Sequence, residues 1–485
     1  MATNRNFIVK QGIQVGTNLT VNGAITSNSF LSNKSDVVAA PSLVLDFGKG
    51  KIDSRLQCSR STNATYVAAN GKIVEVGPNI PRVEWDVTTG ICRGLVCEEA
   101  RTNYFAYSDI EGDVGSLPRG MSLASYPDQT AVISTDVWIG PNKMSCKHTR
   151  GTGSDSNVGY YIMNIGTLTV NAMYAWSCYV YIPSTTTITY CGITAESAVT
   201  TIDSVSGGGA GTADLTIRDR WQRLQLTARV ASSTGQMASV LRVEPAGAIV
   251  YSDCWQAEQG EYCSTWIPTV NTTTKFRQTE YTYLYPLPSV MGFNDTGFSV
   301  LVEASPKWTG NSLMSTVLTT VTSALNPNRG CVSFDVNAAE SGSGGPYNGY
   351  GIMCQPGSAT NGLAFLSRGL VSQPNGFQTS TTSSLGNYVQ TAGYNYNTWV
   401  ANTIVKVGVA VDTTRSRVCV GGDANTIANN TYTGSLYQSS VVVDELRIGV
   451  QNQGGSGPIF GGNVRKLSFF PRALSNNELV ALTET

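Results

Sequence analysis

Apolar and polar residues alternate with a period of two along the longest apolar segments, and this alternation is typical of β-strands with one buried face. Over 174–181, one face would carry Tyr174, Trp176, Cys178 and Val180. Over 221–230, the inward residues would be Leu224, Leu226, Ala228 and Val230. Glycine-rich turns such as 206–209 separate these segments. The pattern predicts an all-β chain built from sandwiches.

The composition sets limits on size and partners. A chain of 485 residues is too long for one ordinary hydrophobic core, so several domains are expected. The formal net charge of −1 gives no electrostatic reason to expect nucleic acid or an anionic membrane as a partner. Neither a membrane span nor an apolar signal core is recognisable, so we expect synthesis in a cytoplasm without a cleaved signal and no membrane insertion.

The cysteines predict neither a zinc site nor a disulfide framework. There are 11 of them, none in Cys-x-x-Cys spacing, and the single histidine, His148, cannot complete a zinc cluster of the usual kind. Cys178 and Cys254 lie in strand-like segments, where a thiol acts as a small buried hydrophobic group. We therefore expect reduced, structural thiols.

Residues 1–41 are interpreted as an N-terminal docking and oligomerisation segment followed by a linker. Strands too short to form a sheet alone alternate with turns, of which Asn22-Gly23 is a strong hairpin signal. Three identical chains would pair these strands without free edges, which predicts a homotrimer. The alternative is a flexible tail with accidental alternation. Residues 7–16 resemble the N-terminal segment of structural proteins of tailed cyanophages, which implies docking to other virion proteins.

Three further regions are expected. Residues 42–110 read as a β-hairpin module with a turn at Asn70-Gly71, and Glu98 with Arg101 is interpreted as a structural ion pair. Residues 111–285 predict a sandwich whose last strand buries Trp255 and Ala257, with Gln256 and Glu258 on the opposite face and a turn at Gln259-Gly260. Together these regions resemble a phage tail-fibre module that leads into a jelly roll similar to carbohydrate-binding modules.

Residues 286–485 form the last predicted domain. Strands are expected at 298–303, at 405–411 and at 444–449, followed by a short terminal helix. Ser475 and Glu478 form a capping box, and Leu479, Val480 and Leu482 make an apolar stripe on that helix. The terminal strand, the Pro-Arg-Ala-Leu-Ser segment and the helix resemble the end of concanavalin A-like, laminin-G-type lectin domains.

No catalytic arrangement can be assembled from the sequence, so the chain is not expected to be an enzyme. A triad would require His148, which is expected instead to be a surface or hydrogen-bonded structural residue. Asp444 and Glu445 are adjacent on a strand and point to opposite faces, so they cannot act as a carboxylate pair. We predict no metal or cofactor, although a loop such as 421–423 could hold calcium in a lectin-like fold.

Ligand binding is easier to support than catalysis. Four tyrosines in Gly- and Asn-rich segments are candidates for exposed, sugar-binding rings: Tyr347, Tyr350, Tyr394 and Tyr396. They could equally pack against neighbouring subunits. No individual ligand-binding residue is assigned.

The resemblances together imply a structural protein of a phage virion. The leading hypothesis is a tail fibre or appendage, docked by its N-terminal segment, that presents lectin-like domains to host-surface glycans. The rival hypothesis is a decoration or connector protein of the capsid, neck or tail with a purely structural role. A depolymerase ranks third.

Overall fold

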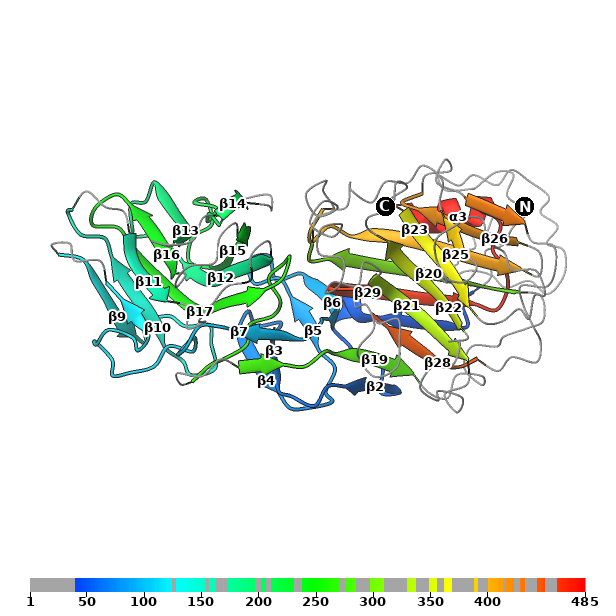
Figure 1. Ribbon diagram of the computed structural model, residues 1–485, viewed down its shortest axis with the longest axis horizontal. Helices are drawn as coiled ribbons and strands as arrows, with labels where there is room; N and C mark the ends of the chain where they lie inside the picture. Colours follow the sequence, from blue (N-terminus) through cyan, green and yellow to red (C-terminus); the bar gives the residue numbers. More distant parts are fainter. Residues whose placement is uncertain are drawn as a thin grey trace, which may run out of the picture. The chain divides into compact units, whose positions relative to one another are not determined.

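The computed structural model describes residues 40–123, 128–153, 157–162, 169, 172–196, 202–205, 211–230, 238–270, 275–284, 297–308, 329–336, 349–355, 362–368, 388–390, 400–412, 415–422, 428–431, 443–449 and 460–484. These residues belong to one compact unit, Ala40–Thr485. The predicted short strands of residues 6–30 lie outside them. The described chain is built almost entirely from β-strands, which confirms the predicted all-β class (Figure 1).

The central sandwich consists of two antiparallel sheets. The six-stranded sheet has the order β14 (Ile202–Val205), β15 (Trp221–Val230), β12 (Met173–Tyr181), β17 (Ile249–Gln259), β10 (Ser145–Thr149) and β9 (Thr130–Ser134). The four-stranded sheet has the order β13 (Tyr190–Glu196), β16 (Ala238–Glu244), β11 (Asn157–Ile162) and β8 (Met121–Ser122).

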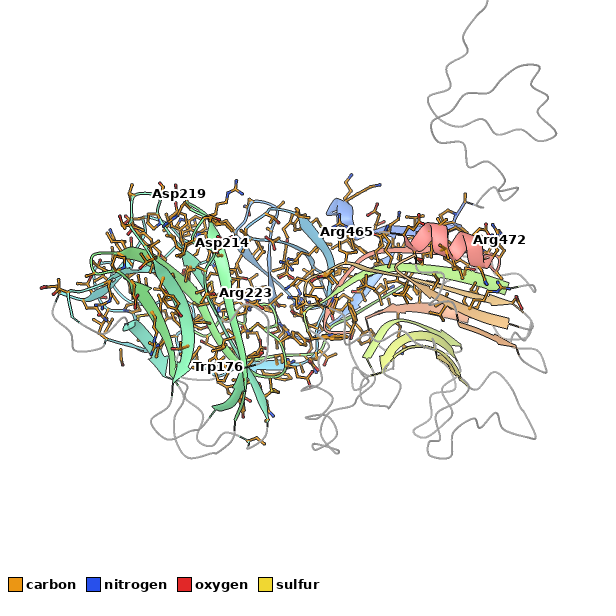
Figure 2. The ribbon with its side chains drawn as sticks, turned by 90° about the horizontal axis from the view of Figure 1, so that it is seen from above. Trp176, Asp214, Asp219, Arg223, Arg465 and Arg472 are labelled. Atoms are coloured by element: carbon orange, nitrogen blue, oxygen red, sulfur yellow. The ribbon has the colours of Figure 1, made fainter. Side chains whose placement is uncertain are left out.

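The core of the central sandwich lies between these sheets. It contains the predicted inward residues of β12 and three of the four predicted for β15, while the side chain of the fourth, Val230, lies outside the description. Trp176, labelled in Figure 2, is completely buried there beside Trp255 of β17. The alternation in the sequence therefore identified the core-facing side of both strands.

Strand β17 differs from the prediction of one buried face. Trp255 and Ala257 enter the core, as predicted, but Gln256 and Glu258 are also fully buried. Their polar groups have hydrogen-bond partners there. The amide Nε2 of Gln256 donates to Glu258 Oε1 (2.8 Å), and the backbone N–H of Ser264, in the segment after β17, donates to the same oxygen (2.6 Å). Polar residues can occupy this face because they satisfy one another's hydrogen bonds.

The C-terminal sandwich is formed by two larger sheets. The first has the order β27 (Ala428–Thr431), β26 (Arg415–Val420), β25 (Val405–Asp412), β20 (Gly297–Pro306), β29 (Gly462–Phe470), β6 (Cys92–Cys97) and β5 (Val83–Trp85), with β1 (Leu43–Asp46) also paired to β29. The second has the order β2 (Leu56–Ser59), β19 (Tyr281–Leu284), β28 (Val443–Ile448), β21 (Arg329–Val336), β22 (Gly349–Gln355), β23 (Gly362–Arg368) and β24 (Tyr388–Gln390).

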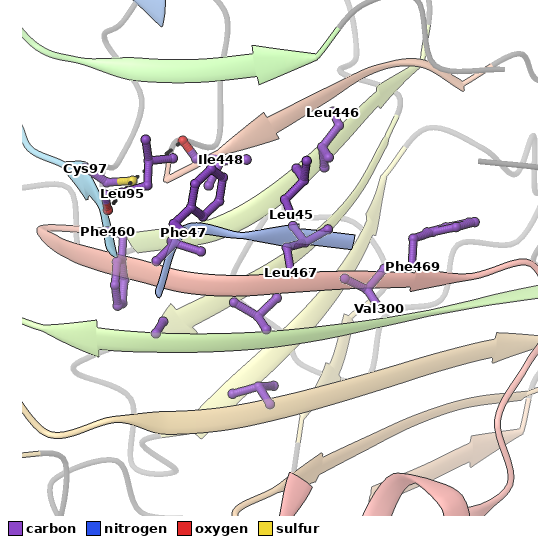
Figure 3. Close-up of a cluster of buried hydrophobic side chains, with 14 of the residues drawn as sticks. Leu45, Phe47, Leu95, Cys97, Val300, Leu446, Ile448, Phe460, Leu467 and Phe469 are labelled. Atoms are coloured by element: carbon purple, nitrogen blue, oxygen red, sulfur yellow. Dashed lines mark hydrogen bonds between the residues drawn. The ribbon is translucent and has the colours of Figure 1, made fainter. Parts of the chain in front are cut away.

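Residues 42–110 contribute strands to both of these sheets. Leu43 of β1 lies opposite Phe469, Leu95 of β6 lies opposite Val464, and β2 pairs with β19. The core between the sheets includes Leu45, Leu446 and Leu467 (Figure 3). The N-terminal part of the described chain therefore completes the C-terminal sandwich.

Shorter elements join the sandwiches to their surroundings. Strands β3 (Ala64–Val67) and β4 (Ile73–Val76) form the predicted hairpin, and Gly71 in the turn between them has a φ of 74°, which glycine adopts easily. Strand β7 (Arg101–Asn103) pairs with β18 (Lys275–Arg277), and the 3-10 helix η1 (Phe47–Lys49) follows β1.

The terminal helix α3 (Asn476–Thr483) begins at the predicted capping box. The backbone N–H of Glu478 donates to Ser475 Oγ (3.3 Å), and the backbone N–H of Ser475 donates to Glu478 Oε2 (2.9 Å). Leu479 is buried against Cys419 and Phe470, with Val480 and Leu482 partly buried beside them. This confirms both the helix and its apolar stripe.

Nine cysteines in the described part of the chain are free and buried, as expected for structural thiols. Among the described helices, none is long and apolar enough to span a membrane.

Candidate ligand-binding pocket

A pocket of about 280 Å³ opens between β5, the turn that follows it, and the outer side of β12 and β15. Val67 and Tyr179, which line it, belong to a small apolar cluster. Most of the remaining lining is polar or charged and includes Glu84, Asp86, Arg93, Arg223, Gln225 and Lys307. Its volume is close to the lower end of the range for small-molecule pockets, about 300 Å³. The polar lining favours a polar ligand.

Two of the pocket's cations are paired with the pocket's two carboxylates. Lys307 Nζ lies 3.0 Å from Glu84 Oε2, and Arg93 pairs with Asp86. Burial alone would raise the pKa of Glu84, but the nearby Lys307 and Arg93 outweigh it and lower that pKa. Burial acts in the same way on Asp86, whose pKa is lowered by Arg93 and by hydrogen bonds from Thr89. Both carboxylates are therefore ionised at neutral pH.

Arg223 is the third cation and is held differently. It projects from β15, where Figure 2 labels it, and its Nη2 donates to Ser177 Oγ (2.9 Å) and to the backbone carbonyl of Ser264 (2.5 Å). Its guanidinium carbon lies 5.4 Å from the centre of the Tyr179 ring. No described carboxylate forms an ion pair with it, and its Nε is buried without a hydrogen-bond partner in the described structure.

Neutral hydrogen-bonding groups complete the pocket. Gln225 lies two residues beyond Arg223 on the same face of β15 and is exposed. Thr212 and Asn402 are exposed at the rim, and Asn402 Oδ1 accepts a hydrogen bond from Arg93. The pocket can therefore offer amide, hydroxyl and guanidinium groups to a ligand rich in hydroxyl groups.

A buried network of charged side chains lies behind the pocket and shares Lys307 with it. Lys307 Nζ is 2.7 Å from Glu98 Oε1, and Arg82 and Arg277 lie 3.1 Å and 2.9 Å from Glu98 Oε2. Arg82 also pairs with Glu280 (2.9 Å), as does Arg60. Glu98 has no exposed surface, and although burial raises its pKa, these cations lower it well below its usual range.

This network corrects the predicted pairing of Glu98 with Arg101. Arg101 instead pairs with Glu99 (2.5 Å) and lies 3.9 Å from Glu258. Glu98 and Arg101 are three residues apart, but the chain between them leaves β6 and enters β7, so their side chains reach different neighbours. The expected ion pair of Arg101 is local, but its partner is Glu99 and not Glu98.

The candidate residues from the sequence have varied outcomes. His148 is fully buried, with Nε2 2.7 Å from Ser252 Oγ, which confirms a hydrogen-bonded structural histidine. The structure does not describe the side chains of the four candidate sugar-binding tyrosines, Tyr347, Tyr350, Tyr394 and Tyr396, or those of Asp444 and Glu445. Gly421 and Gly422 are described but Asp423 is not, so the calcium hypothesis stays a prediction. Among the described side chains, no group of three His, Cys, Asp or Glu residues is arranged to hold a metal ion.

The residues of the pocket were not recognised in the sequence. A weak signal was present, because Arg223 and Gln225 occupy the polar positions of an otherwise well-formed alternation in β15. That pattern indicates which residues leave the core. It does not indicate that they meet Glu84, about 140 residues before Arg223, and Lys307, about 80 residues after it.

Comparison with known proteins identifies no family for this chain. No model of a known protein family matches the chain, and no curated protein sequence matches it. Among solved structures, the CBM40 domain of the Ruminococcus gnavus IT-sialidase bound to α2,3-sialyllactose is 12% identical and has a TM-score of 0.28, over 41% of this chain and 91% of that one. The CBM22-1–CBM22-2 tandem of Paenibacillus barcinonensis Xyn10C is 9% identical with a TM-score of 0.25, over 78% and 99%.

The mouse laminin α1 domains LG4-5 are 8% identical with a TM-score of 0.22, over 76% of this chain and 94% of that one. At these low TM-scores the similarities assign neither a family nor a ligand to the chain. The all-β sandwich architecture is established by the strands and sheets themselves.

Proposed function

We propose that this chain is a glycan-binding protein and that the pocket between β5, β12 and β15 holds part of the glycan. The observation that carries the proposal is the composition of the pocket. Its volume of about 280 Å³ suits a small polar unit, and Arg223, Gln225 and Asn402 present amide and guanidinium groups to it. A ligand rich in hydroxyl groups can satisfy such groups, whereas an apolar ligand would leave them without partners.

The test uses the purified full-length chain on an array of diverse glycans, followed by titration calorimetry with the glycans it retains. Gln225→Ala should weaken binding by about tenfold, which corresponds to the loss of one or two hydrogen bonds. Gln57→Ala is the matched control, because Gln57 is an exposed glutamine on β2 and does not line the pocket. Equal affinities for the two variants would place glycan binding elsewhere on the chain.

We further propose that the protein is a component of a phage virion, a fibre or appendage that attaches through its N-terminal segment as a homotrimer. The support is the resemblance of residues 7–16 to structural proteins of tailed cyanophages, and of residues 42–110 to a module of phage tail-fibre and virion proteins. Antibody labelling of intact particles against residues 286–485, viewed by electron microscopy, tests this role. Label at fibre tips would support host attachment, and label on the capsid or neck would favour a purely structural connector.

A further inference from the structure

We propose that the glycan held in this pocket carries an anionic group, a carboxylate or a sulfate, and that Arg223 is its partner. This inference rests on the proposed glycan-binding function and specifies the chemical class of the ligand. The shared chemistry is a singly charged oxyanion on a sugar ring.

The first argument is the pairing of charges in the pocket walls. Glu84 is committed to Lys307, and Asp86 to Arg93. Lys307 also contacts Glu98, on the side of the buried network. Arg223 is therefore the cation of the pocket that has no carboxylate partner among the described residues, and the pocket walls carry a net positive charge.

The second argument is the state of the Arg223 side chain. Nη2 is fixed by Ser177 and Ser264, and the plane of the guanidinium lies near the Tyr179 ring, so the side chain is already held in one position. A buried Nε without a partner, on a group that keeps its charge, is unfavourable. An oxyanion in the pocket would not reach this Nε, but it would compensate the charge of the guanidinium, and such an interaction is stronger where water is largely excluded.

The described carboxylates of the protein itself do not serve as the partner of Arg223. Glu84 and Glu258 both act on Arg223 electrostatically, but neither forms an ion pair with it. Glu84 is paired with Lys307, and the carboxylate of Glu258 is occupied by Gln256, by the backbone N–H of Ser264 and by Ser264 Oγ (2.7 Å). Neither carboxylate therefore supplies a direct partner for Arg223.

The experiment compares charged and neutral versions of the same glycans. Full-length protein is applied to an array that holds neutral, carboxylated and sulfated glycans, and each retained acidic glycan is titrated beside its carboxyl-reduced or desulfated counterpart. We expect a loss of at least about tenfold on removing the charge and a similar loss for Arg223→Gln, as for a charge-assisted hydrogen bond. Arg223→Lys should retain part of the affinity, and binding should weaken with added salt.

Arg119→Gln is the matched control, because Arg119 is exposed, lies near Glu111 and does not line the pocket. Thermal unfolding of each variant checks that it folds. Binding of carboxylated glycans alone assigns a carboxylate, and binding of sulfated glycans alone assigns a sulfate; either supports the inference. Retention of neutral glycans with no effect of Arg223→Gln would overturn it while leaving glycan binding intact. Retention of no glycan would overturn both proposals.

Discussion

The buried network around Glu98 and the pocket around Arg223 contain the same kinds of side chain but use them differently. In the network, Arg60, Arg82, Arg277 and Lys307 each lie against a carboxylate. In the pocket, Arg223 makes hydrogen bonds to uncharged groups only. Both lie within the same compact unit and share Lys307 as a neighbour.

Whether a buried cation is paired with a carboxylate helps to distinguish a residue that stabilises the fold from one that binds a ligand. When a buried cation is paired with a carboxylate, removing the cation leaves that carboxylate buried without a counter-charge, which is strongly destabilising. A fixed cation that faces a pocket and is paired with no carboxylate leaves no buried charge unpaired when it is removed. The same substitution should therefore cost much more stability in the network than in the pocket.

The largest effect is expected for Arg82→Met. Arg82 donates to Glu280 Oε2 (2.9 Å), to Glu98 Oε2 (3.1 Å) and to Thr265 Oγ1 (2.7 Å), all of them buried. Without it both carboxylates lose a cation in a region closed to water, and the free energy of unfolding should fall by about 3–5 kcal/mol. Chemical denaturation followed by tryptophan fluorescence measures the loss. Arg220→Met is the exposed control, and equal stability of the two variants would contradict a structural role for the network.

A smaller but distinct effect is expected for Gly260→Ala. A Cβ at this position would lie 1.5 Å from Arg101 Nη1, so the guanidinium would have to leave its contacts with Glu99 and with the carbonyl of Gln259. The loss should be about 1–3 kcal/mol, as for other overpacked sites. Gly77→Ala is the control, since the nearest atom to its Cβ would be Ile80 Cδ1 at 3.9 Å. A loss no greater than that of the control would show that Arg101 can move freely.

Much of the fold was predictable because strand alternation is a local property. The inward faces of β12 and β15, the hairpin at Gly71 and the cap of α3 all depend on residues a few positions apart. The buried second face of β17 was not predictable in this way. Gln256 and Glu258 read as solvent-facing, and only the return of residues 261–267 over them accounts for their burial.

The network and the pocket depend on contacts that local patterns do not encode. Glu98 meets Arg277 and Lys307 from segments far away in the sequence, so its nearest basic neighbour in the chain, Arg101, was the wrong partner. Similarly, β15 indicated that Arg223 leaves the core but not what it faces. Tertiary structure decides which polar residues converge, and that is where the sequence interpretation was incomplete.

The comparison extends to a pair of buried carboxyl groups in the central sandwich. Burial, and secondarily Asp253, Glu111 and Glu75, raise the pKa of Asp109 to about 7, against the opposing effect of Lys275. Burial also raises the pKa of Asp253 to about 6, although the backbone N–H groups of Gly140 (3.0 Å) and Ile139 (3.2 Å) donate to its Oδ2. Unlike Glu98, these groups are easier to bury in the protonated form.

Asp109 and Asp253 therefore bind more protons in the folded chain than in the unfolded chain between about pH 4 and pH 7, and their contribution to stability should fall as the pH rises through that window. Asp109→Asn should flatten this slope and be more stable than the parent at pH 8 by about 1–3 kcal/mol. Urea denaturation at several pH values, in buffer with a chelator, measures both effects. Asp113→Asn changes an exposed carboxylate and should keep the parental slope; a parental slope in Asp109→Asn would exclude that carboxyl as its source.

A further expected loss of about 0.5–2 kcal/mol concerns the cap of α3 in Ser475→Ala. Ser475 Oγ accepts the backbone N–H of Glu478, and the helix packs its Leu479 against the C-terminal sandwich. Ser475→Thr should retain most of the stability, because threonine also caps helices. Thermal unfolding distinguishes the two, and equal midpoints for Ala and Thr would show that packing alone holds the helix.

The smallest change in stability is expected for Arg223→Met, the counterpart of Arg82→Met. The substitution removes hydrogen bonds to Ser177 and Ser264 but also removes a buried Nε that has no partner in the described structure, so the net loss should be about 1 kcal/mol or less. Denaturation under the conditions used for Arg82→Met gives the direct comparison. A loss as large as that of Arg82→Met would mean that Arg223 is a structural cation like those of the network. A small loss of stability together with a loss of affinity for acidic glycans would show that Arg223 serves binding, whereas Arg82 serves the stability of the fold.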